Sequence, residues 1–387
     1  MLLPRSECSI NGFKVAAHHC GALVLAAAML HAASAQAGDS DASMFSVSGF
    51  GSLGVVHSSE SSADFNHSFT QANGAGYSRS WSPDVDSRLG AQVSANFSDR
   101  LSAVVQLISE QQWDGSFTPI VEWANMKYAF TPDFSVRIGR IALPTTLLSE
   151  SSKVAYTFPW VRPPVEVNRL MPVTNSDGVD ATYRFRFGQI KHSVTAHYGS
   201  NKVKAPDGSA TGSSSDGRDL VGLGDTMTNG AITLHFGYLQ GRVLLWKLFS
   251  VPALSALAKE RFTITTGSAS YDPGNWFVTA EALRKTLPLS GDQFGWYVSA
   301  GPRIGKFTPY LNYAVQKQLS QPGLLKPGGH KAATAGIRVD MMENIDFKLQ
   351  YERVRNDMGN TGALVARTGF QPGGKVGIFS AVVDFVY

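Results

Sequence analysis

The chain has 387 residues, of which 43% are hydrophobic, 17% charged and 11% aromatic, and its formal net charge is +4. The low charged fraction and the aromatic content exclude an intrinsically disordered protein and a long coiled coil. Basic and acidic residues are interspersed without dense Lys/Arg runs, so we expect no nucleic-acid partner. The length allows either several ordinary domains or one large all-β barrel.

Residues 1–37 have the pattern of a signal peptide. A basic start precedes an apolar run at residues 21–30, and small residues follow with a predicted cleavage site after Ala35 or Ala37. The apolar run is too short to span a bilayer as a stable helix. Both cysteines of the chain lie in this segment, so residues 38–387 would form one exported domain without a disulfide or a catalytic thiolate.

The remainder of the chain alternates apolar and polar residues with the period of a β-strand. From Ile345 to Glu352 every odd-numbered residue is apolar and every even-numbered residue is polar, and similar alternation occurs over 88–97 and 179–187. In a soluble β-sandwich the apolar face would form the core. In a transmembrane barrel it would face lipid, and the polar face would line the lumen.

Three observations favour the barrel. The first is connection length, because outer-membrane barrels alternate short periplasmic turns with long extracellular loops. Seven connections are short and rich in turn-forming residues, and eight are longer, which predicts about sixteen antiparallel strands with both termini periplasmic. The strands are expected at about 45–56, 87–97, 101–111, 120–130, 134–141, 177–187, 190–200, 219–228, 231–240, 259–272, 276–286, 293–304, 307–318, 331–342, 345–355 and 375–387.

The second observation is the position of the aromatic residues, and the third is the end of the chain. Aromatic residues beside the short turns would form a girdle at one membrane interface; they are Phe97, Phe130, Phe134, Phe187, Trp276, Phe307 and Tyr387. The last strand resembles the terminal strand that the barrel assembly machinery recognises in Gram-negative outer-membrane proteins. Its alternate apolar positions, the predicted assembly signal, are Phe379, Ala381, Val383, Phe385 and Tyr387.

Residues 45–387 resemble a Gram-negative outer-membrane porin. The resemblance is carried by FSVSGFGSLGVV, RLGAQVSANFSDRLSAVVQ, VRIGRIALP, PWVRPPVEVNRL and DGVDATYRF. It implies a homotrimer of sixteen-stranded barrels in outer-membrane lipid and lipopolysaccharide, with the third loop, residues 142–176, folded into the lumen. This loop lacks the acidic tip of classical general porins, so their selectivity rules do not transfer.

A barrel of this size holds an aqueous channel, and charges at its constriction set which solutes pass. We therefore predict passive diffusion of small hydrophilic solutes or ions, without a cofactor or a metal site. Basic residues dominate the strands that flank the third loop, which suggests a mild preference for anions. The predicted pore-lining and constriction residues are Arg88, Glu110, Lys127, Arg137, Glu150, Lys153, Arg162, Glu166, Arg169, Arg184, Arg186, Arg303 and Arg338.

Each Arg and Lys residue in this set has an alternative role, because inward cations also pair with carboxylates and stiffen the barrel wall. Lys348 is expected on the lumen face too, with the acids Asp180, Glu281, Asp340, Asp346, Glu352 and Asp384. Arg140 is expected to anchor the third loop. Trp160 is expected to pack beneath the loop, and the alternative is a stacking surface for a sugar or an aromatic solute.

Other functions remain open at this stage. A substrate-selective channel, a barrel enzyme and a soluble secreted β-protein are alternatives, although the chain has no G-x-S-x-G motif and only His197 and His235 among the histidines are expected to point inward. The apolar segment 243–258 contains Lys247 and Pro252, and could be a loop helix, a latch over a neighbouring subunit or an irregular strand.

Overall fold

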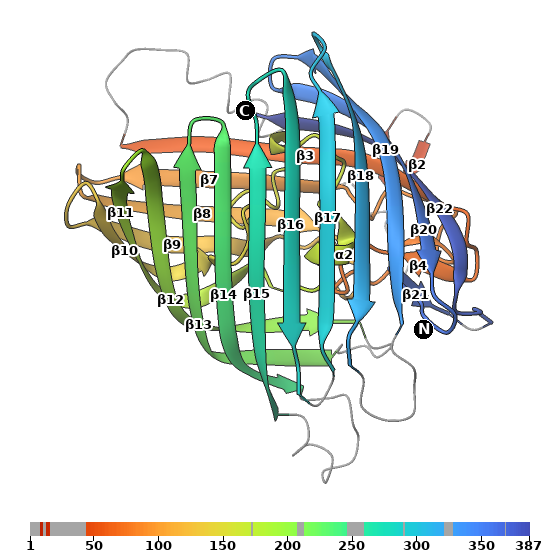
Figure 1. The fold of residues 1–387 in the computed structure, drawn as a ribbon. Coiled ribbons are helices and arrows are strands. Elements are labelled where there is room, and N and C mark those ends of the chain that lie inside the picture. The colour runs from red at the N-terminus through yellow and green to blue at the C-terminus, as the bar shows by residue number, and fades with distance from the viewer. Residues whose placement is uncertain are drawn as a thin grey trace, which may run out of the picture.

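The computed structural model describes residues 8–10, 13–15, 44–171, 173–206, 213–245, 259–288, 291–320, 328–367 and 369–387. Most of the expected signal peptide lies outside these residues; two short paired strands, β1 (Cys8–Ile10) and β2 (Phe13–Val15), fall within it. Sixteen strands of nine or more residues form one closed antiparallel barrel (Figure 1). They are β3 (Phe45–Ser58), β7 (Arg88–Asn96), β8 (Leu101–Glu110), β9 (Ile120–Ala129), β10 (Phe134–Ala142), β11 (Asn175–Phe187), β12 (Ile190–Ala205), β13 (Ser213–Asn229), β14 (Ile232–Leu245), β15 (Lys259–Tyr271), β16 (Trp276–Thr286), β17 (Gln293–Pro302), β18 (Phe307–Gln318), β19 (Gly329–Met342), β20 (Ile345–Asn356) and β22 (Gly374–Val386).

The predicted number and order of strands are confirmed, and the main difference is length at one end. Strands β11 to β14 extend by two to six residues beyond the expected ends, all on the long-loop side. The backbone pairing continues there, for example between Ala205 and Ser213, because main-chain hydrogen bonds do not require the apolar alternation that predicted the strands. Residues 243–245 of the ambiguous apolar segment belong to β14, and residues 246–258 lie outside the described part of the chain.

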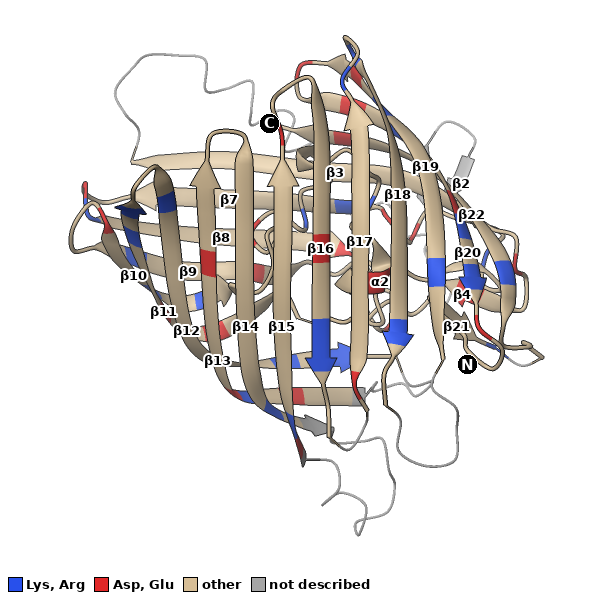
Figure 2. Ribbon diagram, in the orientation of Figure 1, with Lys and Arg blue, Asp and Glu red and all other residues tan. Residues whose placement is uncertain are grey.

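The outer wall of the barrel is apolar and the inner wall is largely polar. Figure 2 shows β14 and β15 free of charged residues over most of their length. Outward Ile138 and Phe187 are 64% and 76% exposed, whereas inward Asp346 and Lys348 on β20 are fully buried. This sidedness is the inverse of a soluble sandwich, because the large apolar side chains face away from the protein interior.

Tight turns close one end of the barrel, at the top of Figure 1, and the long connections leave the other end. Gly188 and Asn344 adopt positive φ values of 60° and 64°, which a two-residue turn between antiparallel strands requires. Five of the seven aromatic residues predicted to line this end are exposed, among them Phe97, Phe130 and Phe307 at 47%, 53% and 51%. They form a ring of aromatic side chains at the turn end of the apolar wall.

The barrel closes where the last strand pairs with the first. Phe385 of β22 lies against Gly51 of β3, and a Cβ at Gly51 would come within 2.4 Å of the Phe385 ring. The Tyr387 ring covers Gly49 in the same way, and the two residues exchange backbone hydrogen bonds of 3.0 and 3.1 Å. The glycines therefore make room for the aromatic residues of the chain end.

Secondary structure outside the barrel wall lies in the long connections. A three-stranded sheet of β4 (Ala63–Phe65), β5 (Ala75–Gly76) and β21 (Leu364–Ala366) joins loop 1 (residues 59–87) to loop 8 (residues 357–373), and β6 (Trp81–Ser82) pairs with β3. A 3₁₀ turn, η1 (Ala155–Thr157), and a short helix, α2 (Val165–Asn168), belong to loop 3 (residues 143–174). No helix among the described residues is long and apolar enough to cross a membrane.

Candidate functional site: a constriction built by loop 3

Loop 3 enters the barrel between β10 and β11. Its two ends are joined by a 3.1 Å hydrogen bond from the Leu143 N–H to the Thr174 carbonyl, and the Thr174 hydroxyl donates to Glu122 at 2.5 Å. The start of the loop then lies against the inner wall at Gly224 and Gly237, where a Cβ would come within 2.5 and 2.2 Å of loop carbonyl oxygens. In this structure the third loop packs against inward positions of the barrel wall.

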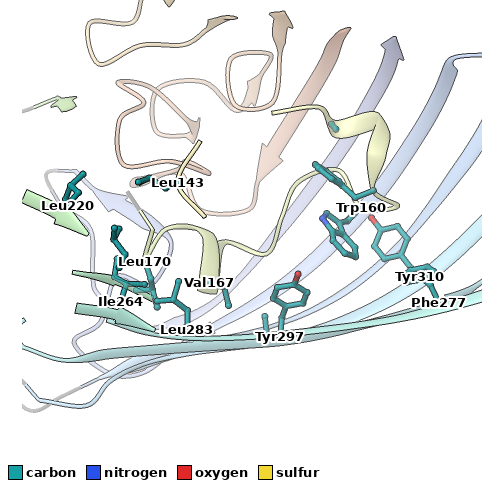
Figure 3. Packing of buried hydrophobic residues seen from close by; sticks show 14 residues of the cluster. Leu143, Trp160, Val167, Leu170, Leu220, Ile264, Phe277, Leu283, Tyr297 and Tyr310 are labelled. Atoms are coloured by element: carbon teal, nitrogen blue, oxygen red, sulfur yellow. The ribbon is translucent and has the colours of Figure 1, made fainter. Parts of the chain in front are cut away.

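Apolar packing attaches the loop to the inner wall of β14 to β18. Figure 3 shows Trp160 and Val167 of the loop above Tyr297 and Leu283 of the wall. The Trp160 ring is 4% exposed and its centroid lies 6.0 Å from that of Tyr297 in an edge-on arrangement. The structure therefore places Trp160 beneath the loop, where the sequence predicted it.

Two predicted lumen cations hold the backbone of loop 3. Lys348, fully buried, donates to the Ala155 carbonyl at 2.7 Å and contacts Asp384 at 2.8 Å. Arg338 donates to the Tyr156 carbonyl at 2.5 Å and pairs with Asp346 at 3.2 Å. Carbonyl groups of a loop inside a barrel need donors when water is excluded, and the inward cations supply them.

The middle of loop 3 is tied to loop 1 and to β22 by Arg162. Its guanidinium donates twice to Asp86, at 2.8 and 2.5 Å, and once to Ser380 at 2.5 Å. Burial alone would raise the pKa of the Asp86 carboxyl, but the guanidinium outweighs it and holds that pKa below its usual value. Arg162 is 3% exposed, so it fixes the loop and does not line an open channel.

Two further ion pairs and one contact between a carboxylate and a histidine connect loop 3 to the barrel. Lys153 pairs with Glu110 of β8, and Glu150 accepts from Arg137 of β10 at 2.9 Å. Arg137 also contacts Asp180 at 2.6 Å, so that one guanidinium joins the wall and the loop. Glu166 lies 3.3 Å from His330 of β19.

Open space remains on the turn side of the loop. One cavity of about 340 Å³ and another of about 300 Å³ share Lys127, Arg137 and Glu150 in their linings, and the first is also lined by Arg184. Arg137 is balanced by Asp180 and Glu150, whereas neither Lys127 nor Arg184 has a carboxylate partner within the described parts of the chain. The region beside the loop base therefore carries an excess of positive charge.

The remaining predicted site residues lie elsewhere. Arg88 is buried directly across from Glu110, and Arg186 lies near the turn between β11 and β12. Arg303 lies in the tight turn between β17 and β18, where it pairs with Asp272 at 2.6 Å. Arg140 donates to Asp177 at 2.7 Å and to the Val121 carbonyl at 3.1 Å. These contacts join the strands that flank loop 3 and do not hold the loop itself.

The two inward histidines form hydrogen bonds with hydroxyl groups of the barrel wall. His197 lies 2.7 Å from the Ser176 hydroxyl, and His235 lies 3.0 Å from the Thr226 hydroxyl.

The apolar anchors of loop 3 are the residues that sequence reasoning missed. Leu239, Ile264 and Leu283 occupy inward positions of β14 to β16 and are at most 1% exposed. The available signal was the presence of large apolar residues on both faces of these strands. In a water-filled barrel such positions indicate a part of the wall that something covers.

Taken together, the closed apolar-walled barrel and its infolded loop define an outer-membrane channel. The chain belongs to the Gram-negative porin family, whose family model matches residues 21–360. A search of curated proteins found no match. The protein is thus a porin of the outer membrane that allows passive diffusion.

Solved structures share this fold at low sequence identity. The anion-selective porin from Comamonas acidovorans is 13% identical with a TM-score of 0.57, and the alignment covers 89% of this chain and 99% of that one. OmpT of Vibrio cholerae is 13% identical with a TM-score of 0.56, over 90% and 99% of the two chains. OmpF of Salmonella typhi, solved with daunomycin, is 12% identical with a TM-score of 0.56, over 88% and 97%.

Proposed function

We propose that the channel passes small hydrophilic solutes or ions with a mild preference for anions, and that it has no catalytic activity. The observation that carries the anion preference is the pair of uncompensated cations, Lys127 and Arg184, in the cavity beside loop 3. A positive potential in a low-dielectric cleft raises the local concentration of anions. The similarity to a porin described as anion-selective agrees with this preference.

The same proposal includes the biogenesis and assembly of the barrel. Residues 1–37 would direct export and be removed after Ala35 or Ala37. Phe379, Ala381, Val383 and Phe385 alternate with buried inward residues of β22, as an assembly signal read by the barrel assembly machinery requires. A homotrimer in outer-membrane lipid and lipopolysaccharide is supported by the trimer form of Vibrio cholerae OmpT, which is 14% identical with a TM-score of 0.54.

The anion preference is tested by the reversal potential of the purified channel in a planar bilayer under a salt gradient. We expect an anion-directed potential for the wild-type protein. In the double variant Lys127→Gln/Arg184→Gln the anion-to-cation permeability ratio should fall by at least about twofold, because the uncompensated charge is removed.

Arg303→Gln is the matched control, since Arg303 pairs with Asp272 in a turn outside the lumen cavities. It should leave the permeability ratio unchanged. A cation-directed potential in the wild-type protein, or an unchanged ratio in the double variant, contradicts the proposed role of these two residues.

A further inference from the structure

A third cavity lies between loop 3 and the long-loop end of the barrel, separate from the two that Lys127 and Arg137 line. It has a volume of about 500 Å³, within the range of small-molecule sites. Its walls are the loop-side ends of β12 to β19, its floor is the end of loop 3, and residues of loops 1 and 8 complete it. A solute entering from this end of the barrel meets this cavity before it reaches the constriction.

The walls of this vestibule are mostly apolar. Leu239, Phe262 and Ile264 of β14 and β15 face Leu170 and Val173 of loop 3. Part of this surface is covered by packing against the loop, and the remainder lines the cavity. A channel that only passes hydrated ions gains nothing from such walls, whereas an apolar portion of a solute would lose unfavourable contact with water here.

Two cations reach the same cavity. Arg169 follows α2 at the floor, and Lys285 lies on the inner face of β16. Of the five N–H donors of Arg169, one donates to the Ala363 carbonyl at 2.6 Å, and this is the only hydrogen bond of its side chain within the described residues. Arg169 lines the cavity, and the planar fork of its guanidinium matches a carboxylate.

Each of the two cations has an acidic residue near it. Glu166 lies 3.3 Å from His330, and its negative charge also interacts with Arg169. Glu260 is the one carboxylate in the lining among the described residues, and its charge interacts with Lys285. Burial lowers the pKa of Arg169 to about 10, so the guanidinium remains protonated at neutral pH.

We propose that this vestibule binds small organic monocarboxylates with an apolar body, the carboxylate at Arg169 and Lys285 and the body against the β14–β15 wall. The inference rests on the proposed function, because it narrows the class of anions that the channel carries. It makes the protein a channel with a solute-binding site ahead of its constriction. Inorganic anions and short hydrophilic carboxylates would pass without occupying it.

The direct test is calorimetric titration of the detergent-purified, folded protein with benzoate. We expect measurable binding of benzoate, and binding of acetate and benzylammonium at least about tenfold weaker, because each probe lacks one of the two features that the site recognises. Arg169→Gln should weaken benzoate binding by at least about tenfold. Lys285→Gln should weaken it as well, and provides a second variant if the loss of the Arg169–Ala363 contact disturbs loop 8.

Arg184→Gln is the matched control, because Arg184 lines a different cavity on the other side of loop 3. It should leave the benzoate affinity unchanged while it lowers the anion preference. Equal affinities for benzoate and acetate, or wild-type benzoate affinity in both Arg169→Gln and Lys285→Gln, overturn the vestibule site. Titration does not depend on conductance, so a cation-directed reversal potential with specific benzoate binding would overturn the anion preference and retain the site.

Discussion

Charged and polar side chains inside this barrel mostly hold protein segments in place, and His67 of loop 1 is a clear case. Its ring Nδ1 lies 2.6 Å from the Val85 carbonyl, and the ring is packed beside Arg88 and Asp86. Burial, with a smaller contribution from Arg88, lowers the pKa of His67 from 6.5 to about 4. The folded loop therefore contains a neutral imidazole throughout the neutral range.

This lowered pKa predicts that loop 1 becomes less stable in mild acid. The unfolded loop binds a proton near pH 6.5 and the folded loop only near pH 4, so the free energy of opening falls as the pH decreases between these values and is constant above them. We expect faster hydrogen exchange in residues 62–86 at pH 5 than at pH 7.5, after correction for intrinsic rates. His67→Gln should remove this pH dependence, and its persistence in the variant would show that another group causes it.

At the scale of elements, the pairing of β22 with β3 depends on small residues under large ones. A valine at position 51 would collide with the Phe385 ring and with Leu89, whose Cδ2 lies 2.8 Å from the added Cβ. We expect Gly51→Val to reduce the yield of folded, heat-modifiable barrel, at a cost of about 1–3 kcal/mol from overpacking. The lipid-facing Gly267 of β15 has open space around its Cβ position, so Gly267→Val should fold normally. Equal folding yields for the two variants would contradict the role assigned to this contact.

The strands were predictable from sequence and the roles of the lumen charges were not. The alternation of apolar and polar residues predicted strand β20 from Ile345 onward, because one face of the strand meets lipid and the other does not. Which inward residue meets water depends on the path of loop 3, and no local pattern encodes that path. Lys127 and Lys348 are both inward lysines, yet one lines an open cavity and the other is sealed against Ala155.

At the scale of the whole molecule, loop 3 divides the lumen and sets how much of it remains open. Trp160 is the largest side chain of the loop in the apolar contact with the wall, and removing a buried tryptophan ring costs about 3–5 kcal/mol. We expect Trp160→Ala to loosen the loop and to give larger, noisier single-channel currents. Trp276→Ala, which removes a lipid-facing ring at the turn end, should conduct like the wild type. Unchanged currents from a folded Trp160→Ala barrel would show that the polar anchors suffice to hold the loop.

The contact between the first and last strands also determines when this barrel can form. Ser52 donates to Asp384 at 2.5 Å across 332 positions of the chain. Contacts of such sequence separation form slowly, because a long segment must be ordered before they contribute. No closed intermediate can exist until the final residues have arrived, and a chain with β22 missing would leave two unpaired edges. Closure of the barrel therefore waits for β22, the last strand in the chain, and all fifteen earlier strands depend on it for a wall without edges.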